Sequence, residues 1–373
     1  MRCFPRGVLH KISTGAVFLS ALFGRPIHAE DSAIPSNRSP IFSARAPERL
    51  TICSQNLANY GLPDEVAYRV NSKKELPLEE REKLLVKRFR EAECHIIAVQ
   101  EVVGRTAESA RAGLSRLAEI LSSMSGKRFI PIVGEANRGD VRVGFLVATE
   151  NITVERVVSY AGALLPPLEK GEKFQRLSRG PLVLQVRWGN QRLTLVAIHL
   201  KSKYGGGRDP YRLQFELLRM QMAEHLRILV ETHFSENLLR NDEWVIIMGD
   251  RNSRQESASN RILRGEQSLV DFRSNGSCIV SRAGESVCVG GVAAREPRFD
   301  SLLSKRFLQG KPSGTYQFGA HFEWIDDILV NRWSLIQALM RGETPRSRVL
   351  VEPKGASDHA LVATTLFRSR DDG

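Results

Sequence analysis

Several segments of the chain are apolar at nearly every position, and they constrain the fold more than any other feature. They span residues 50–54, 96–99, 144–148, 182–188, 193–198, 244–248, 325–330 and 360–366. Helical periodicity predicts helices over residues 78–92, 105–123 and 211–233, the first with its charged residues 79–83 facing outward. A strand that is apolar throughout is covered on both faces. We therefore expect an α/β or α+β domain in which two sheets pack together and helices lie outside them.

The N-terminus has the three parts of a secretory signal peptide. Arg2, Arg6 and Lys11 form a basic head, residues 14–23 are a short apolar segment, and the small residue Ala29 closes the stretch. The apolar segment is too short for a stable membrane span, although an uncleaved membrane anchor is the alternative. We predict a signal peptide over residues 1–29, a flexible leader over 30–47, the folded domain over 48–368 and a tail over 369–373. The protein is then secreted or periplasmic.

The chain is strongly basic. Its formal net charge is +12, and the predicted mature protein keeps +8 because the first 29 residues hold four basic residues and no acidic one. A basic surface favours polyanions, which include nucleic acids and anionic membrane faces. The net charge alone does not choose between these partners.

The four cysteines of the predicted mature chain differ in their settings. Cys53 and Cys94 lie in or beside apolar runs, where buried free thiols are expected. Cys278 and Cys288 share a polar, glycine-rich segment, and an oxidising compartment leaves a local disulfide and a pair of free thiols as equal alternatives there. Neither pair has the spacing of a zinc site.

Polar side chains stand where the apolar runs end. They are Asn56, the pair Gln100-Glu101, His199, Asp250 with Asn252, the pair Asp326-Asp327, and Ser357-Asp358-His359. A single carboxylate after a strand is more often a turn former or a helix cap, and a single histidine there is more often a core residue. Six such strand ends together supply oxygen ligands, two imidazoles and an acid that can orient one of them.

This set of groups meets the needs of phosphodiester hydrolysis. A hard divalent cation such as Mg²⁺, with Mn²⁺ or Ca²⁺ as alternatives, prefers carboxylate and amide oxygens and binds phosphate. The cation neutralises charge in the transition state, while a base activates water and an acid assists the leaving oxygen. We therefore expect a metal-dependent phosphodiester hydrolase.

The order of the motifs resembles the endonuclease/exonuclease/phosphatase superfamily, the fold family of pancreatic deoxyribonuclease, over nearly the whole mature chain. The matching elements are Ser54-Gln55-Asn56, Gln100-Glu101, Arg179-Gly180-Pro181-Leu182, His199-Leu200-Lys201-Ser202, Gly249-Asp250-Arg251-Asn252, Ile325-Asp326-Asp327-Ile328-Leu329 and Ser357-Asp358-His359. The resemblance implies a four-layer α/β sandwich in which two packed, mainly antiparallel sheets are flanked by helices.

The resemblance also implies a set of metal ligands. Glu101 is the principal ligand, Asn56 lies nearby, and Asp358 contributes to the metal environment. The family usually has an aromatic residue where Asp327 stands. Because neighbouring residues of a strand point to opposite faces, we assign the functional role to Asp326 rather than to Asp327.

The remaining roles are implied in the same way. His359, oriented by Asp326, is the general base or a partner of the phosphate. Either His359 or Asp250 takes the proton from water, and the choice stays open because coupled groups share protons. Around the phosphate, His199 protonates the leaving group or stabilises a non-bridging oxygen, Asp250 and Asn252 position water and phosphate, and Arg179 contacts phosphate.

Three insertions, residues 57–77, 201–208 and 253–323, are expected to select the substrate, because the same catalytic centre serves nucleases, sphingomyelinases and phosphoinositide phosphatases. The third interleaves basic and aromatic residues, which suits a nucleic-acid strand, although an ordinary loop is the alternative. No apolar finger for lipid insertion is evident. We expect DNA, and possibly RNA, as the substrate, with no stable protein partner. A phospholipid phosphodiesterase of sphingomyelinase or phosphoinositide type is the alternative, and a non-catalytic binding module is a third hypothesis.

Overall fold

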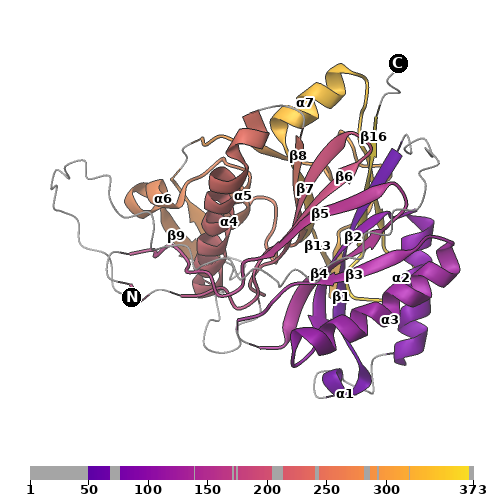
Figure 1. Cartoon of the computed structure of the whole chain (residues 1–373). Coiled ribbons are helices and arrows are strands. Elements are labelled where there is room, and N and C mark those ends of the chain that lie inside the picture. Colours follow the sequence, from indigo (N-terminus) through magenta and orange to yellow (C-terminus); the bar gives the residue numbers. More distant parts are fainter. Residues whose placement is uncertain are drawn as a thin grey trace.

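The computed structural model describes residues 49–67, 76–137, 139–169, 172–173, 175–203, 213–239, 243–280, 286–291, 294–318 and 320–368. The predicted signal peptide, leader and tail lie outside these residues. At the centre two six-stranded sheets face each other, with helices α2 and α3 on one side and helix α4 on the other (Figure 1). This arrangement confirms the predicted four-layer sandwich.

The first sheet has the strand order β15-β16-β1-β2-β4-β3. These strands are β15 (Arg346–Leu350), β16 (Leu361–Phe367), β1 (Arg49–Tyr60), β2 (Ile96–Val103), β4 (Val141–Ala148) and β3 (Phe129–Val133). Only β1 and β2 are parallel, and the other neighbours are antiparallel. The sheet is therefore mainly antiparallel, as expected.

The second sheet has the order β11-β14-β8-β7-β6-β5 and the same mixture of directions. Its strands are β11 (Phe299–Ser301), β14 (Asp326–Asn331), β8 (Glu243–Asp250), β7 (Gln191–His199), β6 (Leu182–Trp188) and β5 (Ile152–Ser159). Here β7 and β8 form the single parallel pair.

The strands are buried on both faces, which explains why they are apolar throughout. In β1, Ile52 packs into the core between the two sheets, whereas its neighbour Cys53 packs into a separate core beneath α2 (Leu78–Glu91) and α3 (Ala107–Ser125). The outer face of the second sheet packs against α4 (Leu213–Leu239) in a third core. Successive side chains of a strand point to opposite faces, so each strand supplies two cores.

Helix α2 departs from one expectation. Arg81 and Glu82 do not face solvent, since only 5% and 1% of their surfaces are exposed. Glu82 accepts hydrogen bonds from the hydroxyl of Tyr60, at 2.8 Å, and from the guanidinium of Arg116 on α3, at 2.7 and 2.9 Å. The prediction of an outward charged face is wrong here because α2 packs against both α3 and the first sheet.

The prediction of free thiols at Cys53 and Cys94 is also wrong. The two residues form a disulfide with a Cα–Cα distance of 5.9 Å, and both are buried. The N–H of His95 donates to the carbonyl of Thr51 at 2.8 Å, so the turn that precedes β2 lies beside β1 and brings the cysteines together.

The third insertion folds into short elements rather than one long loop. It contains α5 (Ala258–Leu263), α6 (Leu269–Asn275), β9 (Ser277–Val280), β10 (Ser286–Val289), β11, β12 (Tyr316–Phe318) and β13 (His321–Glu323). Cys278 and Cys288 stand opposite each other in β9 and β10 and form a disulfide, which settles the two alternatives for this pair.

Two further helices are short. Helix α1 (Pro63–Val66) lies in the first insertion, and α7 (Arg332–Met340) follows β14. Residues 68–75 and 204–208 of the first two insertions lie outside the described residues. Among the helices that the structure describes, none combines the length and apolar character that crossing a membrane requires.

Candidate active site

The strand ends that carry the polar motifs meet at one edge of the sandwich. In the second sheet, the parallel pairing of β7 with β8 sets His199 opposite Asp250, and the antiparallel pairing of β14 with β8 sets Asp326 opposite the same residue. In the first sheet, Asn56 stands opposite Gln100, the residue before Glu101. Strand direction and register therefore bring residues far apart in the sequence to one place.

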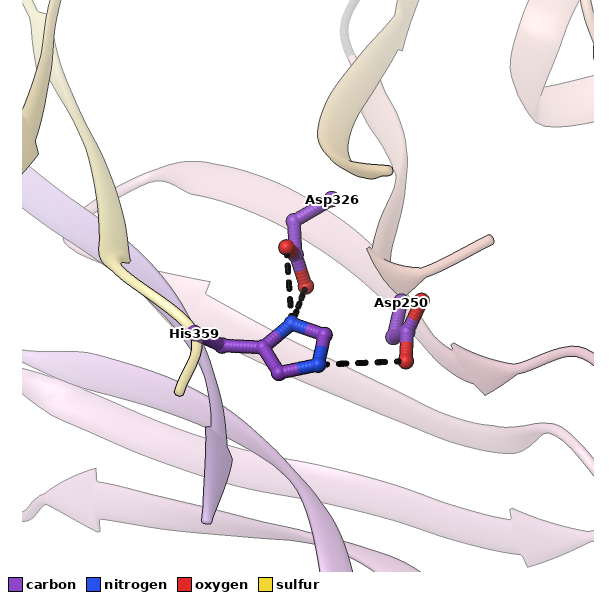
Figure 2. A group of neighbouring side chains, drawn as sticks. All are labelled: Asp250, Asp326 and His359. Carbon is purple, nitrogen blue, oxygen red and sulfur yellow. Dashed lines mark hydrogen bonds and ion pairs between the residues drawn. The ribbon is translucent and has the colours of Figure 1, made fainter. Parts of the chain in front are cut away.

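His359 lies between two carboxylates (Figure 2). Its Nδ1 lies 2.9 and 3.2 Å from the two carboxylate oxygens of Asp326, and its Nε2 lies 3.9 Å from Oδ2 of Asp250. Because a carboxylate accepts, the contact with Asp326 places a proton on Nδ1. Asp327 points the other way, 3.1 Å from the guanidinium of Arg251, as alternation along the strand predicts.

Asn56 connects the two sheets. Its amide nitrogen donates to Oε1 of Glu101 at 3.2 Å and to Oδ2 of Asp250 at 3.1 Å. The second oxygen of Glu101 accepts the N–H of Asn59 at 2.9 Å. Glu101 itself has φ of 60°, a conformation that costs free energy in a non-glycine residue and is held by its surroundings. The Glu101 carboxylate is thus fixed from two sides.

The Gly-Asp-x-Asn motif has a steric explanation. Gly249 has φ of 141°, and a Cβ there would lie 2.1 Å from the carbonyl oxygen of Ile198 on the neighbouring strand. The chain then turns so that Asn252, with φ of 50°, caps Asp250 with its N–H at 2.7 Å and its amide nitrogen at 2.9 Å. Glycine permits the approach of two strands, and asparagine fixes the carboxylate.

His199 is held in one tautomer. The guanidinium of Arg179 lies 3.0 Å from Nδ1 of His199 and can only donate, so Nδ1 accepts and Nε2 carries the proton. Nε2 lies 3.5 Å from Asp250 and 3.8 Å from Glu101. Burial, followed by the charge of Arg179, lowers the pKa of His199 well below its usual value. His199 therefore presents a neutral N–H to the centre of the site.

The charges of Asp250 and His359 act on each other. Burial raises the pKa of Asp250 above its usual value, and the charges of Asp326 and Glu101 add to this effect while His359 opposes it. Burial lowers the pKa of His359, but the carboxylates of Asp326, Asp250 and Asp358 outweigh burial and raise that pKa. The two groups titrate as a coupled pair rather than independently.

Solved structures with this architecture place the chain among known folds. It is similar to ANGEL2, described as a 2',3'-cyclic phosphatase, with a TM-score of 0.53 and 12% identity over 85% of this chain and 95% of that chain. It is similar to an endonuclease/exonuclease/phosphatase family protein from Bacteroides thetaiotaomicron, with a TM-score of 0.50 and 13% identity over 86% of this chain and 96% of that chain. It is also similar to truncated TDP2 from Caenorhabditis elegans, with a TM-score of 0.50 and 13% identity over 86% of this chain and 98% of that chain. This chain has the endonuclease/exonuclease/phosphatase fold. No family model and no curated protein matches its sequence.

In this endonuclease/exonuclease/phosphatase fold the predicted site residues gather at one open cavity of about 1020 Å³. Seven of them line it, namely Glu101, Arg179, His199, Asp250, Asn252, Asp358 and His359. Asn56 and Asp326 lie directly behind and contact the lining residues. All nine predicted residues are therefore part of one assembly.

The donor set at the cavity suits a hard divalent cation. The side chain of Glu101 is 24% exposed and Asp358 is exposed, so both offer oxygens where water and phosphate can complete the coordination. Asn56 turns its amide nitrogen rather than its oxygen to Glu101, and thus orients the carboxylate. Asp250, Asp326 and His359 also offer ligand atoms within 4.8 Å of one another, but all three are buried, Asp326 is hydrogen-bonded to His359, and Asp250 accepts from Asn56 and Asn252.

The cavity includes residues that sequence motifs did not single out. Tyr316 of β12 lies against His359 with a ring centroid separation of 4.8 Å, and the N–H of Gln317 donates to the carbonyl of Asp358 at 3.0 Å. Arg81 of α2 also lines the cavity. No local pattern marks these positions, because they reach the site through contacts between segments distant in the sequence.

The cavity rim is basic and cross-linked by ion pairs. Lys203 lies 2.5 Å and Arg254 lies 3.0 Å from the carboxylate of Glu323 in β13. Arg254 could have been predicted near the cavity, because it follows the site residue Asn252 by two positions in the sequence. Phe322 on the same hairpin lines the cavity and is 41% exposed. The hairpin of β12 and β13 thus forms one wall of the site.

Proposed function

We propose that this protein is a secreted, divalent-metal-dependent phosphodiesterase that hydrolyses nucleic acid, with DNA as the main substrate and RNA as a further one. The observation that carries this proposal is the convergence of a carboxylate, two imidazoles and a paired aspartate from two sheets on one open cavity. That combination supplies a site for a cation, a proton acceptor and a hydrogen-bond donor for phosphate.

The residues divide the chemistry as follows. Mg²⁺, Mn²⁺ or Ca²⁺, held by Glu101 with Asp358, would neutralise phosphate charge when bound. The coupled pair of Asp250 and His359 accepts the proton of the attacking water, and Asp326 orients the imidazole. His199 donates its Nε2 proton as a hydrogen bond to a non-bridging phosphate oxygen, because the contact of Arg179 with Nδ1 rules out a second ring proton.

The surroundings of the cavity favour a polyanionic strand. Arg179, Lys203 and Arg254 line the cavity, and the exposed ring of Phe322 lines it as well. Cations that follow a phosphate backbone and an aromatic ring that stacks on a base are the usual parts of a single-strand binding surface. Secretion is supported by the basic and apolar N-terminal segment and by two disulfides, which persist in oxidising compartments.

The direct test is hydrolysis by the mature protein, residues 30–373, with Mg²⁺, Mn²⁺ or Ca²⁺ in turn. Supercoiled plasmid, a single-stranded oligonucleotide and a matched RNA are the substrates. The proposal expects cleavage that a chelator abolishes. If all three nucleic acids stay intact under every metal, the nucleic-acid assignment is refuted.

Secretion has a separate test. The proposal expects the exported protein to begin at Glu30 and to be released from cells. N-terminal sequencing of the protein recovered outside the cytoplasm checks the cleavage point, and a protein that keeps its first residues and sediments with membranes contradicts it.

One observation favours the alternative of a phospholipid phosphodiesterase. Ile279 and Val287 stand opposite each other in β9 and β10 and are 60% and 41% exposed, while nearby Val289 and Val270 are 45% and 61% exposed. The sequence had suggested no such apolar surface, and a disulfide-linked hairpin with an aliphatic face can contact a lipid surface. Release of phosphocholine from sphingomyelin vesicles, or of inorganic phosphate from phosphoinositide vesicles, would support this alternative.

A further inference from the structure

Helix α2 carries two buried arginines on one face. Arg81 and Arg88 are seven residues apart, which is about two helical turns, and their exposed fractions are 5% and 1%. Both donate hydrogen bonds to backbone carbonyls of segments that carry site residues. Burying a cation costs free energy that hydrogen bonds to its donors offset, so these contacts hold the segments in place.

Arg88 ties together both ends of the segment that carries Asp358 and His359. At its start, one guanidinium nitrogen donates to the carbonyls of Val351 and Pro353 at 2.6 and 2.8 Å. At its end, the other nitrogen donates to the carbonyl of His359 at 2.9 Å. This second nitrogen also donates to the side chain of Gln55 at 3.2 Å, next to Asn56. One side chain therefore closes the loop between β15 and β16.

Arg81 holds the other half of the site. One of its nitrogens donates to the carbonyls of Leu57 and Ala58 at 2.6 and 2.9 Å. The chain at this point is left-handed, with φ of 50° at Ala58 and 57° at Asn59, a conformation unfavourable for alanine. That turn directs the N–H of Asn59 to Oε2 of Glu101. Arg81 thus stabilises the backbone that orients the proposed metal ligand.

A planar guanidinium is suited to this task and a lysine is not. Arg88 reaches four oxygens from two nitrogens in a fixed plane, whereas an ammonium has three donors at one point. Burial lowers the pKa of Arg88 to about 10, so the group stays charged at neutral pH. Geometry and charge are therefore both required at this position.

We propose that α2 positions the active site at two separate points: Arg81 sets the turn that orients Glu101, and Arg88 sets the loop that places His359. Both are positioning residues rather than catalytic ones. The proposal rests on the function proposed above in its kinetic part only, because metal binding and the environment of His359 can be measured without a substrate.

The test compares Arg81→Met and Arg88→Met in the full mature chain. Arg81→Met is expected to weaken Mn²⁺ binding, measured by calorimetry, about 10- to 100-fold, with the turnover number at saturating Mn²⁺ within about threefold of wild type. Arg88→Met is expected to weaken Mn²⁺ binding less than Arg81→Met does, because the loop that it loosens carries Asp358 and not the principal ligand Glu101, and to lower the turnover number about 10- to 100-fold. The ¹⁵N imidazole signal of His359, assigned with His359→Gln, is expected to move in Arg88→Met only.

Two controls separate positioning from general stability. Arg116→Met leaves the buried Glu82 on the same helix with one partner fewer and touches neither loop, so it is expected to lower the unfolding midpoint in urea without changing Mn²⁺ binding or the His359 signal. Arg90→Met changes an exposed arginine of α2 and is expected to alter nothing. Arg88→Lys, which keeps the charge, is expected to behave like Arg88→Met, and serves as the test if the methionine variant does not fold.

The outcomes are distinct. The proposal would be overturned if Arg81→Met, Arg88→Met and Arg116→Met all lost Mn²⁺ binding and the wild-type His359 signal to the same extent. That result would mean that α2 only stabilises the fold and does not position the site at two separate points. Wild-type Mn²⁺ affinity, turnover number and His359 signal in both Arg81→Met and Arg88→Met would overturn it as well. If the wild-type protein cleaves none of the substrates, the function proposed above fails, while the binding and NMR results still decide the roles of Arg81 and Arg88.

Discussion

The disulfide between Cys53 and Cys94 should contribute a large share of the stability of this domain. It closes a segment with a sequence separation of 41. The chain-entropy relation for a loop of that length gives about 4 kcal/mol at 25 °C, arising from the restriction of the unfolded chain. Because folded domains are stable by only about 5–15 kcal/mol, loss of this bond should be severe.

The assay is urea unfolding of the mature protein with both disulfides formed, compared with Cys53→Ala/Cys94→Ala. We expect the free energy of unfolding to fall by about 3–5 kcal/mol, since both side chains are buried and alanine adds a small packing loss. A matched variant, Cys278→Ala/Cys288→Ala, closes a segment with a separation of only 10 and should lose less. A double alanine variant at Cys53 and Cys94 as stable as wild type would show that this disulfide does not stabilise the domain.

Three further predictions concern single side chains. Asp326→Asn removes the charge that orients His359 and should lower plasmid cleavage about 10²- to 10⁴-fold with little change in the melting temperature; a wild-type rate would contradict the assigned role. Arg179→Met frees Nδ1 of His199 and should lower kcat/KM about 10- to 100-fold, while Arg187→Met, a surface change on β6, serves as the control in the same assay. Burial lowers the pKa of His225 to about 4, below its unfolded value of 6.5, so the unfolded state binds more protons between these pH values and stability falls as the pH is lowered. From pH 7 to pH 5 this loss is about 2 kcal/mol, and urea unfolding of His225→Leu should show a pH dependence smaller by that amount; an unchanged slope would contradict it.

The interiors of the strands could be predicted from the sequence because burial on both faces leaves a continuous apolar run. The run over 182–188 coincides with β6 (Leu182–Trp188). The prediction failed at the strand ends: β1 extends to Tyr60, beyond residue 54, because the polar Gln55 and Asn56 interrupt the apolar pattern although both still pair with β2. Because Gln55 and Asn56 are polar residues at or beside the site, the apolar pattern alone does not reveal where β1 ends.

The candidate site was predictable as a set of residues but not as an arrangement. Glu101 and His199 follow apolar strands, so their type and position were visible. The buried roles of Arg81 and Arg88 were not, because an arginine at a helix surface and one that bonds to distant carbonyls look alike in sequence. The pairing of Cys53 with Cys94 likewise depends on which strands become neighbours, and that follows from packing of the whole domain.

The most direct measurement is plasmid cleavage with Mg²⁺ by the mature wild-type protein beside Glu101→Gln and His359→Ala, each with and without a chelator. We predict nicking by wild type that the chelator abolishes, and a loss of activity of at least 100-fold in both variants while their unfolding midpoints stay close to wild type. Nicking that persists in the chelator, or in both variants at the wild-type rate, would contradict a metal-dependent phosphodiesterase centred on this cavity.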